Sequence, residues 1–289
     1  MIIFYQKRRF SKDKIMYFCT MRKNGFLLLI GLVVLVTFVS CNSYNKLLKS
    51  TDNELKYNTA MSLYENRDYN RALQLFDVVQ AAYRGKPEGE QIAYYTAECY
   101  YNMKDYEIAS HYYKRYVVNY PFAKNAEPAL FRSACCYYLE SPNISLDQTE
   151  SYTAISEFQN FVDIYPQSVL VDSANKLIDT LRYKISEKDF NTCMLYYKME
   201  EYQAAITSFE NFIKENPITH HREEIINYMV LTYFNYAKNS VEEKQRERYE
   251  LALEKYNTLV NMYPESKYIP ELEPTIKIIQ EELSNIKTK

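Results

Sequence analysis

The stretch YYTAECYYNMKDYEIASHYYKRYVVNYP, residues 94–121, contains the pattern that decides the fold. An acid, Asp105, precedes a tyrosine and then an alanine, Ala109, and an aromatic, Tyr113. Pro121 closes the stretch, and proline ends a helix because it lacks an amide donor and restrains the residue before it. The stretch therefore predicts a helix that begins near Asp105 and stops before Pro121.

The same pattern occurs in four other places along the chain. An earlier copy lies 37 residues upstream, with Ala72 and Phe76 at the positions of Ala109 and Tyr113. The later copies are Ala154 with Phe158 and Phe161, Ala205 with Phe209 and Phe212, and Ala252 with Tyr256 and Leu259. Four copies end at a proline, namely Pro121, Pro166, Pro217 and Pro264. Self-similarity of this kind indicates a repeat architecture.

A second predicted helix precedes each copy and carries a small residue at a fixed place. These residues are Ala60, Ala97, Ala134, Cys193 and Val230, and a leucine or tyrosine follows each of them three positions later. Small residues where two helices cross allow close approach, and larger side chains fill the gaps beside them. The sequence therefore predicts antiparallel helix pairs stacked in a solenoid.

This combination resembles the tetratricopeptide repeat, which has a small residue in its first helix, an alanine and an aromatic in its second, and a terminal proline. The usual tryptophan and glycine of that family are absent. Extra residues follow Ser141 in the third copy, and a charged insertion spans Val241 to Arg248 in the fifth. The resemblance implies an all-α fold with five helix pairs over residues 53–264, stacked in a right-handed solenoid.

Residues 265–289 follow the last repeat and predict one more helix. Ile276, Ile279 and Leu283 are spaced by three and four, which places them on one helical face. We expect a capping helix, because a terminal repeat needs its open face covered. A helix that binds a partner is the alternative.

The first 40 residues have the layout of a signal peptide. Seven Lys or Arg residues precede an apolar stretch, Phe26 to Val39, that is shorter than the roughly 20 residues of a membrane span. The tail FVSC, residues 38–41, resembles the lipobox, in which the cysteine is lipidated and becomes the mature N-terminus. Lipidation of Cys41 is therefore expected, and a simple signal peptide with a chance cysteine is the alternative.

The long basic lead also fits a translation start at Met21. More than one acyl chain on Cys41 would anchor the mature chain stably to a membrane. Residues 41–52 would then form a short polar tether that leads directly into the first repeat.

Composition excludes several classes of protein. The chain has four glycines and 31 tyrosines in 289 residues, so the glycine clusters of P-loop and Rossmann enzymes are absent. Few glycines also predict few positions with positive φ, as expected for a chain of helix pairs. Residues 41–289 carry 28 basic and 36 acidic residues, a net charge of −8, which disfavours nucleic-acid binding.

Catalysis and metal or cofactor binding find little support in the sequence. The adjacent pair His220 and His221 would project about 100° apart on a helix, so we expect a surface pair and no chelate, and no metal-binding motif accompanies it. The cysteines outside the leader and anchor are Cys99, Cys135, Cys136 and Cys193. They lie in apolar helical patterns, so we expect them to be small buried apolar residues. We therefore expect a protein that is not an enzyme and has no cofactor.

The first helix of each pair is expected to line a concave groove. Residues three before and four after the small residue should face it: Tyr57, Tyr64, Tyr94, Tyr101, Phe131, Tyr138, Phe190, Tyr197, Asn227 and Phe234. Aromatic rings at nine of these ten positions suggest a trough for extended peptide, because tyrosine offers a large rigid surface and one hydroxyl. Ordinary helix packing is the alternative for each residue. The first six are the predicted peptide-binding residues.

The lipid-anchored five-repeat chain resembles the BamD family of outer-membrane assembly lipoproteins. The repeat number, the anchor position and the tyrosine-proline helix ends carry this resemblance from Cys41 to about Leu283. It implies a periplasm-facing lipoprotein that helps to insert β-barrel proteins into the outer membrane. Repeats one to three would receive the C-terminal strand of an unfolded barrel, and repeats four and five would dock the barrel insertase, alongside accessory lipoproteins.

Two other functions stay open at this point. One is a tetratricopeptide-repeat scaffold lipoprotein that coordinates peptidoglycan and outer-membrane work. The other is a nutrient-capture lipoprotein similar to the SusD group, whose members are usually much longer.

Overall fold

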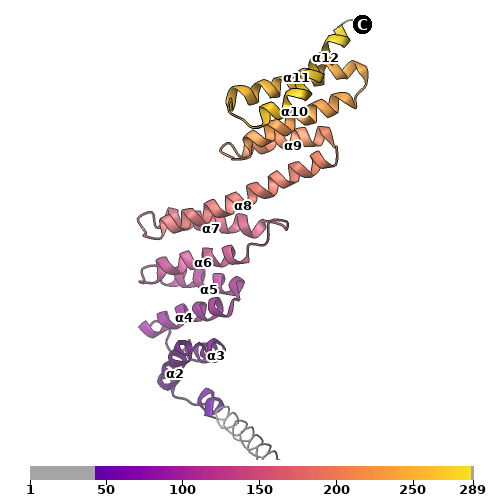
Figure 1. Ribbon diagram of the computed structural model, residues 1–289. Helices are drawn as coiled ribbons and strands as arrows, with labels where there is room; N and C mark the ends of the chain where they lie inside the picture. Colours follow the sequence, from indigo (N-terminus) through magenta and orange to yellow (C-terminus); the bar gives the residue numbers. More distant parts are fainter. Residues whose placement is uncertain (1–42, 288–289) are drawn as a thin grey trace, which may run out of the picture. The chain divides into compact units, whose positions relative to one another are not determined.

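The computed structural model describes residues 43–287, and all regular secondary structure in this range is helical (Figure 1). A short helical segment over residues 43–48 precedes five helix pairs. The pairs are α2 (Asn53–Glu65) with α3 (Tyr69–Val79), α4 (Pro87–Met103) with α5 (Tyr106–Asn119), α6 (Ala126–Glu140) with α7 (Thr149–Ile164), α8 (Val171–Lys198) with α9 (Tyr202–Glu215), and α10 (Arg222–Lys238) with α11 (Glu242–Met262). Helix α12 (Tyr268–Lys287) follows. The predicted helix pairs are confirmed, whereas the signal peptide and Cys41 lie outside the described residues.

The chain divides into two compact units. The first unit ends at Pro121 and contains the first two helix pairs. The second unit begins at Phe122 and contains the other three pairs and α12. No helix among the described residues is long and apolar enough to cross a membrane.

The repeated sequence pattern marks the ends of the second helix in each pair. Asp68, Asp105 and Glu201 are the N-cap residues of α3, α5 and α9. The Asp68 carboxylate accepts a hydrogen bond from the backbone N–H of Arg71, which satisfies one of the amides that a helix start leaves without a partner. At the other end, α5, α7, α9 and α11 each stop directly before the proline of the repeat pattern. Their C-cap residues are Tyr120, Tyr165, Asn216 and Tyr263.

The turn between paired helices is left-handed in repeats one, two and four. Arg67, Lys104 and Glu200 have φ angles of 63°, 67° and 59°, and each lies seven residues after the small residue of its repeat. Among the described residues only these three and Gly85 have a positive φ angle, so the expectation of few such positions is confirmed, although three of the four are not glycine. Residues other than glycine adopt this conformation at a cost of about 1 kcal/mol each, because Cβ approaches the following carbonyl oxygen.

The fixed small residues and the repeated aromatics form the packed interior. Ala60, Ala97, Ala134, Cys193 and Val230 are all at most 2% exposed. The aromatics at the equivalent position of the second helix are completely buried in four repeats: Phe76, Tyr113, Phe158 and Phe209. The two helices of a pair approach closely at the small residue, which leaves no room for solvent beside the aromatic ring. The repeated small and aromatic residues therefore mark where the helices pack.

Helix α8 is unusually long, with 28 residues, and it belongs to the packing of two repeats. It packs against α7 and also against α9. In its first half the buried residues are Ala174, Ile178 and Leu181, spaced by four and three. In its second half Cys193 and Met194 join the apolar core that continues into α9 and α10. One uninterrupted helix therefore joins repeats three and four within the second unit.

Helix α12 covers the end of the last repeat. Leu272, Ile276 and Ile279 are buried in a core shared with α10 and α11, and Leu283 packs beside them. The predicted apolar face is thus confirmed as a capping surface. The charged insertion from Val241 onward forms the first turns of the lengthened α11.

Candidate peptide-binding surface

Two tyrosines of α2 connect the first repeat to the second. Tyr57 and Tyr64 are half-buried, and both hydroxyl groups donate to side chains of α4. The Tyr57 hydroxyl lies 2.5 Å from Gln91 Oε1, and the Tyr64 hydroxyl lies 3.3 Å from Glu98 Oε2. Each partner lies 34 residues further along the chain, three fewer than the offset of 37 between Ala60 and Ala97. Each tyrosine therefore reaches a residue one helical turn before its own equivalent in α4.

Glu98 is a carboxylate in the packed interior of the first unit, with only 5% of its surface exposed. Its Oε1 accepts a hydrogen bond of 2.6 Å from the hydroxyl of Tyr113 on α5, while Oε2 accepts the bond from Tyr64 on α2. Burying a charge is costly unless hydrogen bonds compensate it, and bonds to a charged acceptor are stronger than neutral ones. Glu98 therefore links three helices of the first unit through one carboxylate.

The electrostatics keep these hydroxyl groups protonated. Burial, followed by the charge of Glu98, raises the pKa of Tyr64 well above its usual value. Burial and a hydrogen bond to Glu90, 3.0 Å from the hydroxyl, raise the pKa of Tyr116 in the same way. An ionised carboxylate can only accept hydrogen bonds, so Tyr64 and Tyr116 each act as the donor to their own carboxylate partner. Neither hydroxyl is therefore placed to act as a nucleophile or a general base.

Tyr94 and Tyr101 pack edge-on against the second helix of their own repeat. The ring centroid of Tyr94 lies 5.5 Å from that of Tyr116, and the ring centroid of Tyr101 lies 5.5 Å from that of Tyr106. Both rings also approach Tyr113, at 6.4 and 6.2 Å. Both side chains are half-buried, so each ring contributes one face to packing and keeps another at the surface.

The second unit has six residues at the same repeat positions, of which four are half-buried and two are buried. Phe131 is half-buried and packs against Phe158 and Phe161, with centroids 5.6 and 5.4 Å apart. Tyr138 is also half-buried. Phe190 and Asn227, in contrast, are only 9% and 6% exposed, so the expectation that they face a groove is wrong. Their equivalents in the first three repeats remain predicted peptide contacts.

A hollow of about 710 Å³ lies at the N-terminal end of the first unit. Tyr44 and Leu47 of the segment before α2, Leu55 and Leu63 of α2, and Arg71 of α3 are among its lining residues. The Tyr44 hydroxyl donates to the carbonyl oxygen of Arg71 at 2.8 Å, which fixes the segment against the repeat. The sequence suggested only a polar tether at this place, because the contact partners lie more than 20 residues away.

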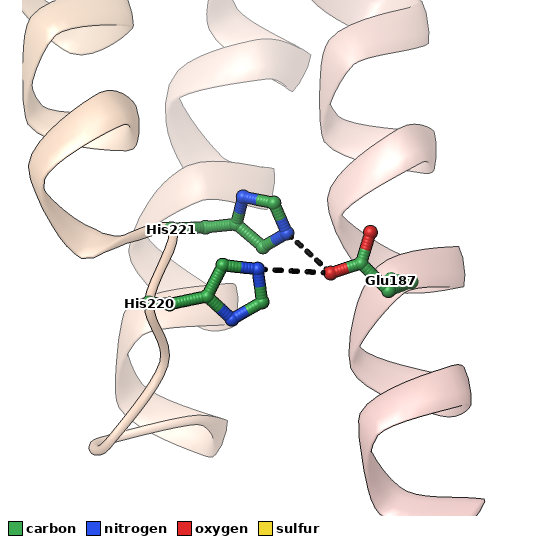
Figure 2. Close-up of side chains that lie close together, drawn as sticks. All are labelled: Glu187, His220 and His221. Atoms are coloured by element: carbon green, nitrogen blue, oxygen red, sulfur yellow. Dashed lines mark hydrogen bonds and ion pairs between the residues drawn. The ribbon is translucent and has the colours of Figure 1, made fainter. Parts of the chain in front are cut away.

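The histidine pair differs from the expectation of a surface pair. His221 is buried, with 9% of its surface exposed, and only His220 lies at the surface. Both rings point toward the carboxylate of Glu187 on α8 (Figure 2). The helical geometry assumed for the pair does not apply, because His220 lies in the turn before α10 and His221 is the N-cap of that helix.

The cysteines behave largely as predicted. Cys99, Cys136 and Cys193 are buried and free, and Cys135 is free and half-buried. Burial raises the pKa of Cys99 to about 12 and that of Cys135 to about 11. A thiol that stays protonated is a poor nucleophile, so these residues serve the packing of the helices.

Comparison with protein families gives one match. The family model YfiO, described as outer membrane lipoprotein, matches residues 49–207 and again residues 192–288. These ranges cover all five helix pairs and α12. Among curated proteins none matches.

Solved structures with the same kind of repeat are similar at low sequence identity. A TPR repeats protein from Bacteroides fragilis is 13% identical with a TM-score of 0.40, and the match covers 83% of this chain and 99% of that one. The TPR domain of P58(IPK) is 12% identical with a TM-score of 0.38, over 85% of this chain and 69% of that one.

Proposed function

This chain belongs to the YfiO family of outer membrane lipoproteins, and we propose that it acts as a BamD-type subunit of the machinery that assembles β-barrel proteins. The observation that carries the proposal is the family match over both structural units, from residue 49 to residue 288. In this role the protein is not an enzyme. It is anchored to the outer membrane through Cys41, faces the periplasm and acts through protein contacts.

The half-buried aromatic residues of the first three repeats are the proposed contacts for an unfolded barrel. They are Tyr57, Tyr64, Tyr94, Tyr101, Phe131 and Tyr138. In the first unit, neighbouring rings hold all four tyrosines, and Gln91 and Glu98 accept hydrogen bonds from two of them, so little side-chain freedom remains to be lost on binding. A preorganised aromatic surface of this kind suits an extended segment that ends in an aromatic residue. Repeats four and five are the proposed docking surface for the barrel insertase.

Replacing Tyr94 and Tyr101 together by alanine tests the receptor. A peptide copying the C-terminal strand of an outer-membrane barrel should bind the variant about 2 kcal/mol more weakly, measured by fluorescence anisotropy. Tyr197→Ala is the matched control, because Tyr197 occupies the position of Tyr101 in repeat four and is also half-buried. Circular dichroism checks that each variant is folded. Equal affinity of wild type and folded double variant assigns the two rings to packing alone.

Purification of the native complex tests the assembly role. We expect a membrane-embedded barrel insertase and its accessory lipoproteins to co-purify, and depletion of the protein to lower the amounts of outer-membrane barrels. Co-purification with envelope-division proteins and normal barrel levels would instead support a cell-envelope scaffold. Glycan binding by the isolated protein would support a nutrient-capture lipoprotein of the SusD type.

A further inference from the structure

Glu187, His220 and His221 bring three metal-ligating atoms together in the second unit (Figure 2). The Nε2 atom of His220 lies 3.1 Å from Glu187 Oε1, and the Nε2 atom of His221 lies 2.6 Å from the same oxygen. All three ligand atoms lie within 4.8 Å of one another. The carboxylate comes from α8 and the imidazoles come from the start of α10, so the cluster joins the first helices of repeats four and five.

Packing holds both imidazole rings in the orientation that points Nε2 at Glu187. The His221 ring stacks on Phe190 with centroids 3.7 Å apart and planes 6° from parallel. The His220 ring stacks on Tyr183, with centroids 5.4 Å apart and planes 16° from parallel. Fixed rings lose little freedom when they bind an ion, which favours binding.

A second carboxylate completes the arrangement around His221. Glu224 Oε2 lies 3.5 Å from His221 Nδ1, on the side of the ring away from Glu187. An imidazole that binds a metal through Nε2 carries its proton on Nδ1, and a carboxylate beside that proton fixes the tautomer and strengthens the ligand. At 3.5 Å the Glu224 carboxylate forms an ion pair with His221 and lies beside this N–H.

We propose that Glu187, His220 and His221 form a binding site for one Zn²⁺ ion. Zinc takes nitrogen and oxygen ligands at about 2.0–2.2 Å in a tetrahedron, which separates neighbouring ligand atoms by roughly 3.3 Å. The separation of 3.1 Å from His220 to Glu187 already approaches this value, and that of 2.6 Å from His221 requires an opening of roughly 0.7 Å. The His220 side chain is 55% exposed, so water has access to a fourth ligand position.

The ligand types select zinc over the abundant hard cations. Calcium and magnesium take six or more oxygen ligands, whereas this cluster offers two imidazole nitrogens and one carboxylate oxygen. The bound ion would fasten α8 to α10. Because the ligands come together only in the folded chain, zinc binding stabilises the fold.

The binding experiment uses the full chain, purified in detergent without a histidine tag, and titrates zinc against a chelating dye. Wild type should bind one zinc ion per chain, and His220→Ala should weaken binding at least 10-fold, since one of three ligands is lost. His111→Ala is the matched control, because His111 is an exposed histidine of α5 outside the cluster. Excess Mg²⁺ should not displace the zinc. Equal zinc affinity of wild type and His220→Ala would overturn the proposal, as would an absence of saturable binding.

Two further measurements distinguish this site from zinc binding by the cysteines. Zinc at 100-fold excess over the wild-type Kd should raise the Tm of wild type by about 5 °C, and the same concentration should raise that of His220→Ala by no more than about half as much. Glu187→Gln keeps the shape of the side chain and serves as the second variant if His220→Ala fails to fold. Co²⁺ bound in place of zinc should show no thiolate charge-transfer band, and such a band would move the site to the cysteines and refute this assignment.

Discussion

Repeats two and four place different chemistry at equivalent core positions. In repeat two, Tyr113 is completely buried and its hydroxyl donates to Glu98, which directly follows the small residue Ala97. In repeat four the same two positions hold Phe209, also completely buried, and Met194. Repeat two therefore pairs a buried tyrosine with a carboxylate, whereas repeat four pairs a buried phenylalanine with the thioether of a methionine. The difference teaches that in these two repeats the ring position keeps its volume, while the polarity of the ring is matched by the residue one position after the small one.

The largest expected effect comes from removing the carboxylate of repeat two. Glu98→Met should lower the free energy of unfolding by about 3 kcal/mol, because Tyr113 and Tyr64 lose a charged acceptor in a buried place. Adding Tyr113→Phe, which copies the pair of repeat four, should restore roughly 2 kcal/mol of that loss. Urea unfolding of the single and double variants measures the coupling. Strictly additive effects would show that Glu98 and Tyr113 do not depend on one another.

The reverse change in repeat four should have a somewhat smaller effect. Phe209→Tyr places a hydroxyl in an apolar core beside Met194, and a buried hydroxyl without an acceptor costs about 2 kcal/mol. Phe158→Tyr in repeat three is a comparison at the equivalent, completely buried position. Thermal or urea unfolding reports the loss. Wild-type stability of Phe209→Tyr would mean that the ring position tolerates a hydroxyl without a matched partner.

The turns between paired helices offer a comparison with smaller expected changes in the free energy of unfolding. Lys104 has a φ angle of 67°, so Lys104→Gly should relieve strain and raise the free energy of unfolding by up to about 1 kcal/mol. In repeat five Asn239, the C-cap of α10, has a φ angle of −94°, and Asn239→Gly should lower the free energy of unfolding by a few tenths of a kcal/mol. Urea unfolding of both variants measures the two changes in the free energy of unfolding. Destabilisation by Lys104→Gly would show that contacts of the lysine outweigh its backbone strain.

The smallest effect concerns thiol reactivity in the two units. Burial raises the pKa of both thiols, to about 12 for Cys99 and to about 11 for Cys135, so Cys135 holds the larger thiolate fraction at pH 8. Cys135, half-buried in the second unit, should therefore react first with a maleimide in the native protein. Mass spectrometry assigns the labelled residue, and denatured protein provides the control in which all thiols react. Faster labelling of Cys99 would contradict its burial.

Much of the fold follows from local sequence features. The prolines after Tyr120, Tyr165, Asn216 and Tyr263 mark helix ends because a missing amide donor acts within a few residues. The acids before the second helices are N-caps for the same local reason. The left-handed turns were not predicted, because lysine, arginine and glutamate carry no signal for positive φ.

The candidate sites depend on contacts that the sequence does not reveal. The spacing around Ala97 predicted which rings lie on the first helix, but it did not distinguish half-buried Tyr94 from buried Phe190 at the equivalent position of repeat four. Phe190 is covered because the His221 ring stacks on it. Glu98 and Glu187 gave no signal at all, since each resembles the many acids of solvated helix faces.

The sequence by itself determined the repeated helix pairs, most of the ends of their second helices, and a helix after the last repeat. These features depend on interactions over a few residues or on a pattern repeated five times, and both leave a visible trace in the order of residues. Only the tertiary structure decided that Glu98 joins Tyr64 and Tyr113 and that Glu187 faces the histidine pair. The partners of these carboxylates lie 15 to 34 residues away, and only the packing of separate helices brings them within hydrogen-bond distance.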